Sequence, residues 1–169
     1  MEEKLLARTD SLTGLLNPRA FNDSAQREID KARRFKRPFT VAYMDLDNFK
    51  MVNDQLGHSV GDALLQLVAE TIKKNTRVVD IVARPGGDEF IILLPETGIE
   101  SSKIVFSKLR EQIMKAMEAN SWAVTLSIGA VTYINPPDTV DNMIKKVDNL
   151  MYSAKNSGKN KIIQELIDK

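Results

Sequence analysis

Residues 84–90 run Arg-Pro-Gly-Gly-Asp-Glu-Phe, and this stretch decides how the rest of the chain is arranged. The paired glycines can take the positive φ values that a tight hairpin turn requires. Apolar runs flank the turn at residues 81–83 and 90–94, as expected for two short buried strands. The sequence therefore predicts a rigid hairpin that carries Asp88 and Glu89 at its tip. Taken alone, a Gly-Gly-Asp turn is more often an ordinary solvated hairpin.

A second acidic stretch follows another apolar run. Residues 39–44 are predicted to form a buried strand, and Asp45 and Asp47 lie at its end. Helical segments separate this strand from the hairpin, and a strand–helix–strand connection within one sheet makes the two strands parallel. Both strands then end at the same edge of the sheet. We therefore expect Asp88 and Glu89 to lie close to Asp45.

Carboxylates clustered at one sheet edge repel one another, and the usual resolution is a hard divalent cation. Mg²⁺ typically bridges one or two carboxylates to substrate phosphates, so the cluster points to a nucleotide substrate. A helix predicted to begin at Asn48 would offer free backbone N–H groups to a phosphate, with Lys50 on the same turn. The alternative is that Asp47 only caps this helix and Lys50 is solvated.

The apolar spacing along the chain predicts alternating helices and strands. Helices are expected at residues 18–35, 48–55, 60–74, 100–118 and 140–155, and strands at 39–44, 81–83, 90–94, 122–133 and 161–163. The first helix is expected to bury Phe21, Ile29 and Phe35 on one face. This order predicts an α+β fold, in which helices flank a mostly antiparallel central sheet of about five strands.

The composition is that of one ordinary globular domain, with 169 residues, 43% of them hydrophobic, and a formal net charge of +1. The near balance of charge argues against a nucleic-acid partner. Cysteine is absent, which suits a cytoplasmic location. The apolar runs are only as long as strands, so we expect no segment to span a membrane and no membrane contact by this domain. Residues 1–9 are predicted to end an upstream helix or linker and residues 10–169 to form the domain, so we expect a larger parent protein.

Asn53, Asp54 and Asp62 lie in a glycine-punctuated stretch at residues 53–62. A carboxylate can accept hydrogen bonds from the N1–H and amino group of guanine, and an asparagine beside it can complete the recognition. Ordinary turn and capping chemistry explains the same residues, and spacing alone favours that simpler interpretation.

Taken together, these residues make the sequence resemble the GGDEF domain family, the diguanylate cyclases that make cyclic di-GMP from GTP. The resemblance runs from Asp10 to Asn160. It rests on motifs that occur in family order: Asp10-Ser11-Leu12-Thr13-Gly14-Leu15, Asp45-Leu46-Asp47-Asn48-Phe49-Lys50, Asn53-Asp54, Gly57-His58, Gly61-Asp62, Gly86-Gly87-Asp88-Glu89-Phe90, Ser127-Ile128-Gly129, Asp148, Tyr152-Ser153-Ala154-Lys155 and Gly158-Lys159-Asn160. The implied fold is similar to the palm of nucleotide cyclases and polymerases.

The resemblance also implies a role for individual residues. Mg²⁺, or Mn²⁺ in its place, would be bound by Asp45, Asp88 and the carbonyl of Leu46. Glu89 is a candidate for assisting deprotonation of the attacking 3′-hydroxyl. The remaining substrate contacts would come from Asn53 and Asp62 to guanine, and from Lys50, Lys155, Lys159 and the backbone around Asn48 and Phe49 to the triphosphate.

The implied activity is the condensation of two GTP into cyclic di-GMP with release of two pyrophosphates. Each domain would bind one GTP, so that the active site forms between two copies related by a two-fold axis. An upstream sensory or regulatory domain would then control how often the copies meet.

Arg77 and Asp80 stand where the family carries an Arg-x-x-Asp motif that binds product and inhibits the enzyme. Lys108 or Arg110 of a neighbouring domain would complete this site. The alternative is a surface ion pair that leads into a strand.

The sequence departs from the family pattern at three positions. Pro85 replaces an aromatic or aliphatic residue and stiffens the entry to the turn. Pro18 replaces a common arginine with no expected consequence, and Lys159 replaces an arginine, which loses a bidentate contact to phosphate.

Two competing hypotheses remain. One is a non-catalytic receptor for cyclic di-GMP or GTP, and the other, a different purine-nucleotide cyclase, is disfavoured by the intact guanine pair.

Overall fold

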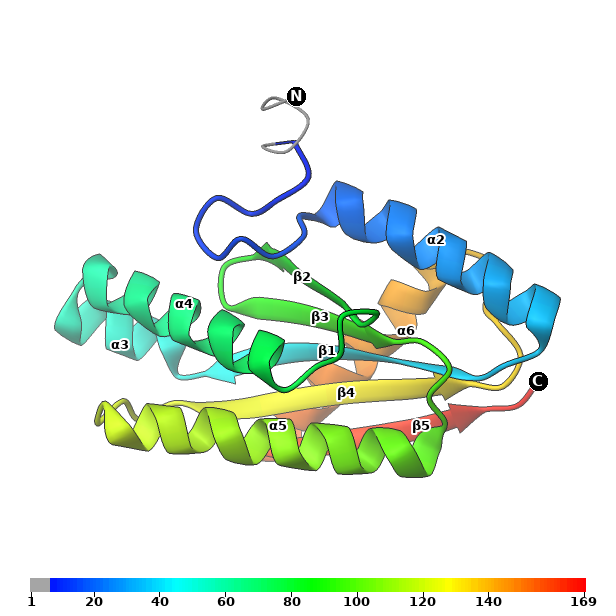
Figure 1. Ribbon diagram of the computed structural model, residues 1–169. Coiled ribbons are helices and arrows are strands. Elements are labelled where there is room, and N and C mark those ends of the chain that lie inside the picture. Colours follow the sequence, from blue (N-terminus) through cyan, green and yellow to red (C-terminus); the bar gives the residue numbers. More distant parts are fainter. Residues whose placement is uncertain (1–6) are drawn as a thin grey trace.

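A single mixed sheet forms the centre of the computed structural model, which describes residues 7–169 (Figure 1). Its strands lie in the order β2-β3-β1-β4-β5, and only the β4–β5 pairing is parallel. The strands are β1 (Phe39–Asp47), β2 (Ile81–Gly86), β3 (Glu89–Leu94), β4 (Thr125–Tyr133) and β5 (Lys161–Ile167). The predicted α+β class and the mostly antiparallel sheet are confirmed.

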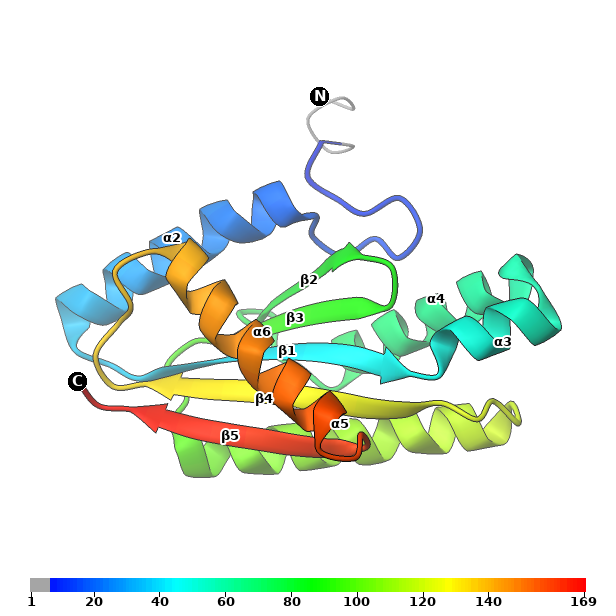
Figure 2. The ribbon, with the colours of Figure 1, turned by 180° about the vertical axis from the view of Figure 1, so that it is seen from behind.

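Helices cover both faces of the sheet (Figures 1 and 2). The helices are α2 (Pro18–Phe35), α3 (Phe49–Leu56), α4 (His58–Lys74), α5 (Ile99–Ala119) and α6 (Val140–Asn156). One apolar core joins the sheet to α3, α4 and α5, and a second core joins the opposite face to α2 and α6. Among the residues described, none of the helices combines the length and the apolar character needed to cross a membrane.

The central strand β1 is buried along its whole length, which explains why residues 39–44 are apolar apart from Thr40. Side chains alternate between the two faces of a strand. Met44 and Leu46 accordingly contribute to the core with α4 and α5, whereas Val41 and Tyr43 contribute to the core with α2 and α6. Continuing this alternation places Asp45 on the α6 side of the sheet, where Lys155 of α6 forms an ion pair with it.

The predicted meeting of the two acidic stretches is confirmed. Strands β1 and β2 both pair antiparallel with β3 and are therefore parallel to each other. Asp45 is the register partner of Glu89, and the Leu46 N–H donates to the carbonyl of Asp88 at 3.2 Å. The glycine turn itself has φ values of 154° at Gly86 and 52° at Gly87, so both glycines are in the region that favours glycine.

A loop before α2 fixes the far side of this turn. The Arg84 guanidinium donates to both oxygens of Asp10 at 3.0 and 3.1 Å and to the carbonyl of Gly87 at 2.8 Å. Both partners of the ion pair are largely buried, and Leu16 forms an isolated bridge with Ala83. The start of the domain is therefore bound directly to the hairpin.

Some predicted details differ from the structure. Phe35 is 57% exposed rather than buried, because α2 ends there and Lys36 takes a left-handed conformation with φ of 54°. Helix α3 begins at Phe49 instead of Asn48. Of the predicted linker at residues 1–9, residues 1–6 lie outside the described residues, and the division between linker and domain remains a prediction.

Candidate active site

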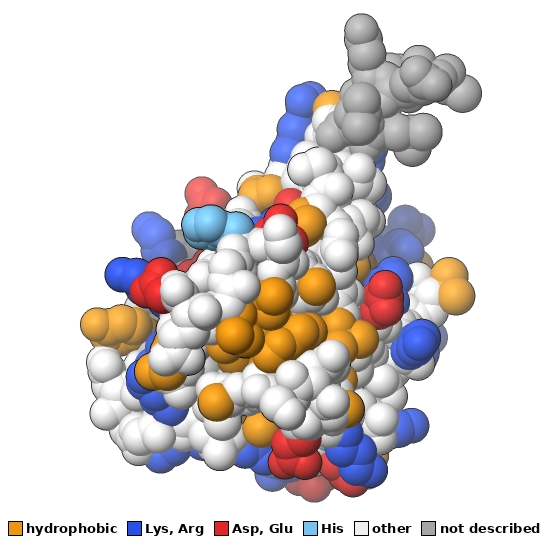
Figure 3. All heavy atoms as spheres, turned by 90° about the vertical axis from the view of Figure 1, so that its left-hand side faces the viewer, with side chains coloured by type: hydrophobic (Ala, Val, Ile, Leu, Met, Phe, Trp, Pro, Cys, Tyr) orange, Lys and Arg blue, Asp and Glu red, His pale blue; other side chains and the backbone are white. Residues whose placement is uncertain are grey.

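Three predicted carboxylates come together where β1 ends and the hairpin turns. Asp45 is 9% exposed and lies opposite Glu89, while Asp88 occupies the turn between β2 and β3. Figure 3 shows the end of the molecule that forms this edge, with apolar side chains gathered in the middle and charged ones around them. The three carboxylates therefore lie at an end of the molecule that also exposes apolar side chains.

The electrostatics of this cluster favour a cation. Burial, and then the charge of Asp45, raise the pKa of Asp88 to about 6. Lys155 of α6 pairs with the Oδ2 of Asp45 at 2.6 Å, while the Oδ1 of Asp45 is buried and makes no hydrogen bond among the described residues. A buried carboxylate oxygen without a donor is costly, and a bound cation would satisfy it.

A metal at this edge would have few side-chain ligands. Within residues 7–169, no group of three or more His, Cys, Asp or Glu side chains is arranged to hold a metal. The expected set is instead two carboxylates, Asp45 and Asp88, and the carbonyl of Leu46. Mg²⁺ normally retains several waters and takes further oxygens from substrate phosphates, and it seldom needs a complete set of protein ligands. A set of two carboxylates and one carbonyl is therefore suited to Mg²⁺.

Asp47 is buried beneath the cluster and does not cap α3. Its oxygens accept hydrogen bonds from Thr125 and Ser127, both at 2.7 Å, and from the backbone N–H of Asn160 at 3.0 Å. Burial alone would raise the pKa of Asp47, but these hydrogen bonds and the nearby Lys155 lower it. The capping alternative is therefore wrong, and Asp47 instead ties β1 to β4 and to the loop after α6.

Glu89 receives a hydrogen bond that the motif comparison did not predict. The hydroxyl of Tyr43 donates to Glu89 Oε2 at 2.5 Å. Burial, followed by this bond and the charge of Glu89, raises the pKa of Tyr43. Burial and then the charge of Asp45 also raise the pKa of Asp148 of α6. The period-two alternation of β1 was the one available clue, because it places Tyr43 and Asp45 on the same face.

The proposed guanine residues occupy facing positions on α3 and α4. A Cβ on Gly61 would lie 1.7 Å from Oδ1 of Asn53, so the asparagine packs directly over the glycine. Asn53 Oδ1 is buried and makes no hydrogen bond among the residues described. Asp62 follows Gly61 and is exposed. Gly61 therefore lets Asn53 of α3 pack closely on α4, and the exposed Asp62 comes next along α4.

The expected triphosphate contacts are only partly assembled. Asn48 has a φ of 67° and provides no side-chain cap, which leaves the first N–H groups of α3, near Phe49, without that partner. Lys155 lies in the carboxylate cluster, as described above. Lys50 and Lys159 are exposed, and Lys159 has a φ of 61°. The side chains of these two lysines form no hydrogen bond or ion pair within residues 7–169.

The predicted inhibitory residues Arg77 and Asp80 form an ion pair with each other. Arg77 donates to Asp80 at 2.8 Å, and its backbone N–H donates to the same carboxylate at 2.6 Å. The Asp80 side chain is 2% exposed, whereas that of Arg77 is 55% exposed and also donates to the Pro95 carbonyl. Asp80 therefore holds Arg77 in place, and the guanidinium presents its remaining surface outward.

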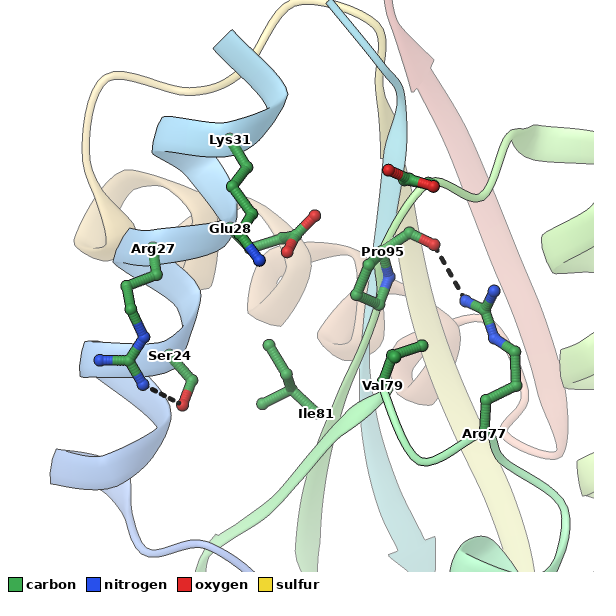
Figure 4. A pocket seen from close by; sticks show the side chains of 9 residues that line it. Ser24, Arg27, Glu28, Lys31, Arg77, Val79, Ile81 and Pro95 are labelled. Atoms are coloured by element: carbon green, nitrogen blue, oxygen red, sulfur yellow. Dashed lines mark hydrogen bonds between the residues drawn. The ribbon is translucent and has the colours of Figure 1, made fainter. Parts of the chain in front are cut away.

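Arg77 borders a hollow of about 430 Å³ between α2 and the strand β2 (Figure 4). Arg27, Glu28 and Lys31 extend from α2 on one side, and Arg77 lies on the other. Of the residues expected from a neighbouring domain, Lys108 is exposed, and Arg110 donates to the Oδ1 of Asn160 within the same chain. Neither of them lines this hollow.

Comparison with known proteins assigns the chain to a family. The family model "Diguanylate cyclase, GGDEF domain" matches residues 7–161. The chain belongs to the GGDEF domain family. This GGDEF domain is 37% identical over 157 residues to the diguanylate cyclase DosC of Escherichia coli, a match that covers 90% of this chain and 34% of DosC.

Two further relatives show the range of proteins that contain such a domain. The cyclic di-GMP phosphodiesterase NbdA of Pseudomonas aeruginosa is 34% identical over 157 residues, covering 92% of this chain and 20% of NbdA. The structure of the coiled coil and GGDEF domain of DgcB from Caulobacter crescentus, in complex with c-di-GMP, has a TM-score of 0.86 at 26% identity, covering 97% of this chain and 88% of that one. The chain thus spans well under half the length of the curated relatives named here.

Proposed function

We propose that this GGDEF domain is a diguanylate cyclase that condenses two GTP into cyclic di-GMP with release of two pyrophosphates. The observation that carries the proposal is the carboxylate edge, where Asp45 has a buried oxygen that finds no donor within residues 7–169, beside Asp88, whose pKa is raised. A receptor that recognises cyclic di-GMP through Arg77 alone would not depend on this arrangement. Relatives named diguanylate cyclases support the same activity.

The substrate is proposed to be GTP. Guanine would lie against α3 and α4, with its N1–H and amino group donating to Asp62 and with the Asn53 amide beside them. The Asn53 Oδ1, for which the described part of the chain offers no hydrogen-bond partner, supports this role. The N–H groups around Asn48 and Phe49, and the side chains Lys50, Lys155 and Lys159, would contact the triphosphate.

The metal is proposed to be Mg²⁺, with Mn²⁺ as a substitute, held by Asp45, Asp88 and the Leu46 carbonyl. When bound, it would supply positive charge that stabilises the triphosphate and the leaving pyrophosphate. Lys155 already lies against Asp45, so its cation would remain close to the phosphates when they bind.

In each of two equivalent steps, the 3′-oxygen of one GTP attacks the α-phosphorus of the other. The bond between that phosphorus and the pyrophosphate oxygen breaks, and Glu89 is proposed to accept the 3′-hydroxyl proton. One domain supplies only one GTP and one carboxylate edge. A second copy must therefore face the first across a two-fold axis, and two pyrophosphates leave for each cyclic di-GMP formed.

Product inhibition is proposed to act through Arg77 and Asp80, with Lys108 or Arg110 contributed by a neighbouring copy. The outward guanidinium of Arg77 beside a hollow of about 430 Å³ supports this site. An upstream sensory or regulatory domain is part of the same proposal, because the meeting of two copies would be the regulated step. The proposed location is the cytoplasm.

The second candidate is a receptor that binds cyclic di-GMP or GTP without turnover, and the accessible Arg77 favours it.

The test follows pyrophosphate and cyclic di-GMP formation with GTP and Mg²⁺ over a wide range of protein concentrations. We expect specific activity to rise with concentration and to fall at least about a thousandfold in Asp88→Ala. Asp138→Ala is the matched control, since this exposed carboxylate lies in the loop before α6.

The absence of product at every concentration would overturn the cyclase proposal. If cyclic di-GMP nevertheless binds tightly, and binding is lost in Arg77→Ala, the domain is the receptor. An active enzyme whose specific activity does not depend on concentration would instead contradict the two-copy site.

A further inference from the structure

Tyr43 is a buried tyrosine whose only polar atom reaches the carboxylate edge. Its residue is 7% exposed, and it belongs to the core that includes Val147 and Met151 of α6. At the end of this apolar slot the hydroxyl donates to Glu89 Oε2 at 2.5 Å. A rigid ring held on a central strand has little freedom to move, so it can fix the group to which it is bonded.

The charges around Glu89 show why it needs such a partner. Lys155 pairs with Asp45 at 2.6 Å and with Asp47 at 3.6 Å. No lysine or arginine forms an ion pair with Glu89 within residues 7–169, and the Tyr43 hydroxyl is its side-chain hydrogen-bond donor there. Asp45 lies directly opposite on β1 and repels it. Without the hydroxyl, this repulsion would favour rotation of Glu89 away from the edge.

We propose that Tyr43 is a positioning residue that holds the Glu89 carboxylate beside Asp45 through its hydroxyl. This inference rests on the proposed cyclase function. Tyr43 occupies Oε2, so the half-buried carboxylate keeps its other oxygen for a reacting group. The interaction orients Glu89 without placing a second cation at the edge, where it would compete with a metal.

The test is a double-mutant cycle with GTP and Mg²⁺, in which kcat and KM are measured separately. Tyr43→Phe keeps the ring and removes only the hydroxyl. We expect kcat to fall about tenfold while KM for GTP stays within about twofold, because the loss concerns alignment at the chemical step. Glu89→Asp shortens the side chain by one methylene and already breaks the contact. Adding Tyr43→Phe to that variant should therefore change kcat by less than about twofold.

Tyr133→Phe is the matched control. Tyr133 is 4% exposed, lies in the same core, and its ring stacks on Phe39 with centroids 5.4 Å apart. Its hydroxyl makes no hydrogen bond within residues 7–169, so this variant should retain the wild-type kcat. A loss of kcat in both tyrosine variants would indicate a general packing effect and overturn the positioning role.

A second measurement does not need turnover. The ¹³Cζ resonance of Tyr43 should shift between wild-type protein and Glu89→Asp, since the hydroxyl loses its acceptor, while that of Tyr133 should stay in place. An unmoved Tyr43 resonance would overturn the proposal. So would an active wild-type enzyme whose kcat is unchanged in Tyr43→Phe, or equal losses in both backgrounds of the cycle. A wild-type protein that makes no cyclic di-GMP overturns the proposed function instead.

Discussion

Substitution of Gly129 by alanine should displace helix α6 from the sheet. A Cβ at this position would lie 2.2 Å from the backbone nitrogen of Met151 and 2.6 Å from the carbonyl carbon of Leu150. Ordinary van der Waals contacts of a Cβ begin at about 3.4 Å, so the helix would have to retreat by about 1 Å. Side chains can rotate away from such an overlap, but helical backbone cannot.

Overpacking a well-filled core typically costs about 1–3 kcal/mol, and the backbone contact places Gly129→Ala at the upper end, about 3 kcal/mol. For a domain of this length each kcal/mol lowers Tm by about 2–4 °C, so Tm should fall by about 6–12 °C. Because α6 carries Lys155, the pair with Asp45 at 2.6 Å should also loosen, and the proposed cyclase activity should fall.

Urea unfolding followed by circular dichroism measures the stability, with Gly98→Ala as control. Gly98 has a φ of −83°, and a Cβ there would meet nothing within 4 Å, so this variant should lose less than about 1 kcal/mol. If Gly129→Ala unfolds within about 0.5 kcal/mol of wild type, the helix does not resist the added methyl group and the argument from close packing fails.

Two further predictions concern charged groups. Because burial and then Asp45 raise the pKa of Asp88 from 3.8 to about 6, native protein binds this proton more tightly than the unfolded chain does. The stability it provides is present below about pH 4 and lost as pH rises through about 6. After discounting for its partial exposure, Asp88→Asn should be about 1–2 kcal/mol more stable than wild type at pH 7.5 without divalent metal. This gain should shrink toward pH 4 in urea unfolding, and a gain that does not change with pH would refute the argument. Arg84→Met leaves Asp10 buried without its cation and should cost about 3 kcal/mol, against less than about 1 kcal/mol for Arg37→Met, whose ion pair is exposed; equal losses in the same unfolding experiment would contradict the prediction.

The sequence alone predicted the elements and the meeting of the two acidic stretches. The helices have clear apolar periods and the central strands are apolar runs, and the helical connection between β1 and β2 favours a parallel relation between these strands. The hairpin then brings Asp88 beside Asp45 once β3 pairs with β1. The glycine pair could likewise be assigned to a tight turn from local conformational preference.

Only the tertiary structure decided which partner each buried polar group has. The hydrogen bond from Tyr43 to Glu89 depends on the exact register of β1 against β3, and the partners of Asp47 come from β4 and from the loop after α6. Phe35 fits the apolar period of α2 but is the last residue of the helix and is 57% exposed. Periodicity shows which face of an element turns inward, because it is a property of the local backbone. Which atoms meet there depends on strand register and helix placement, which are set by contacts between residues far apart in the sequence.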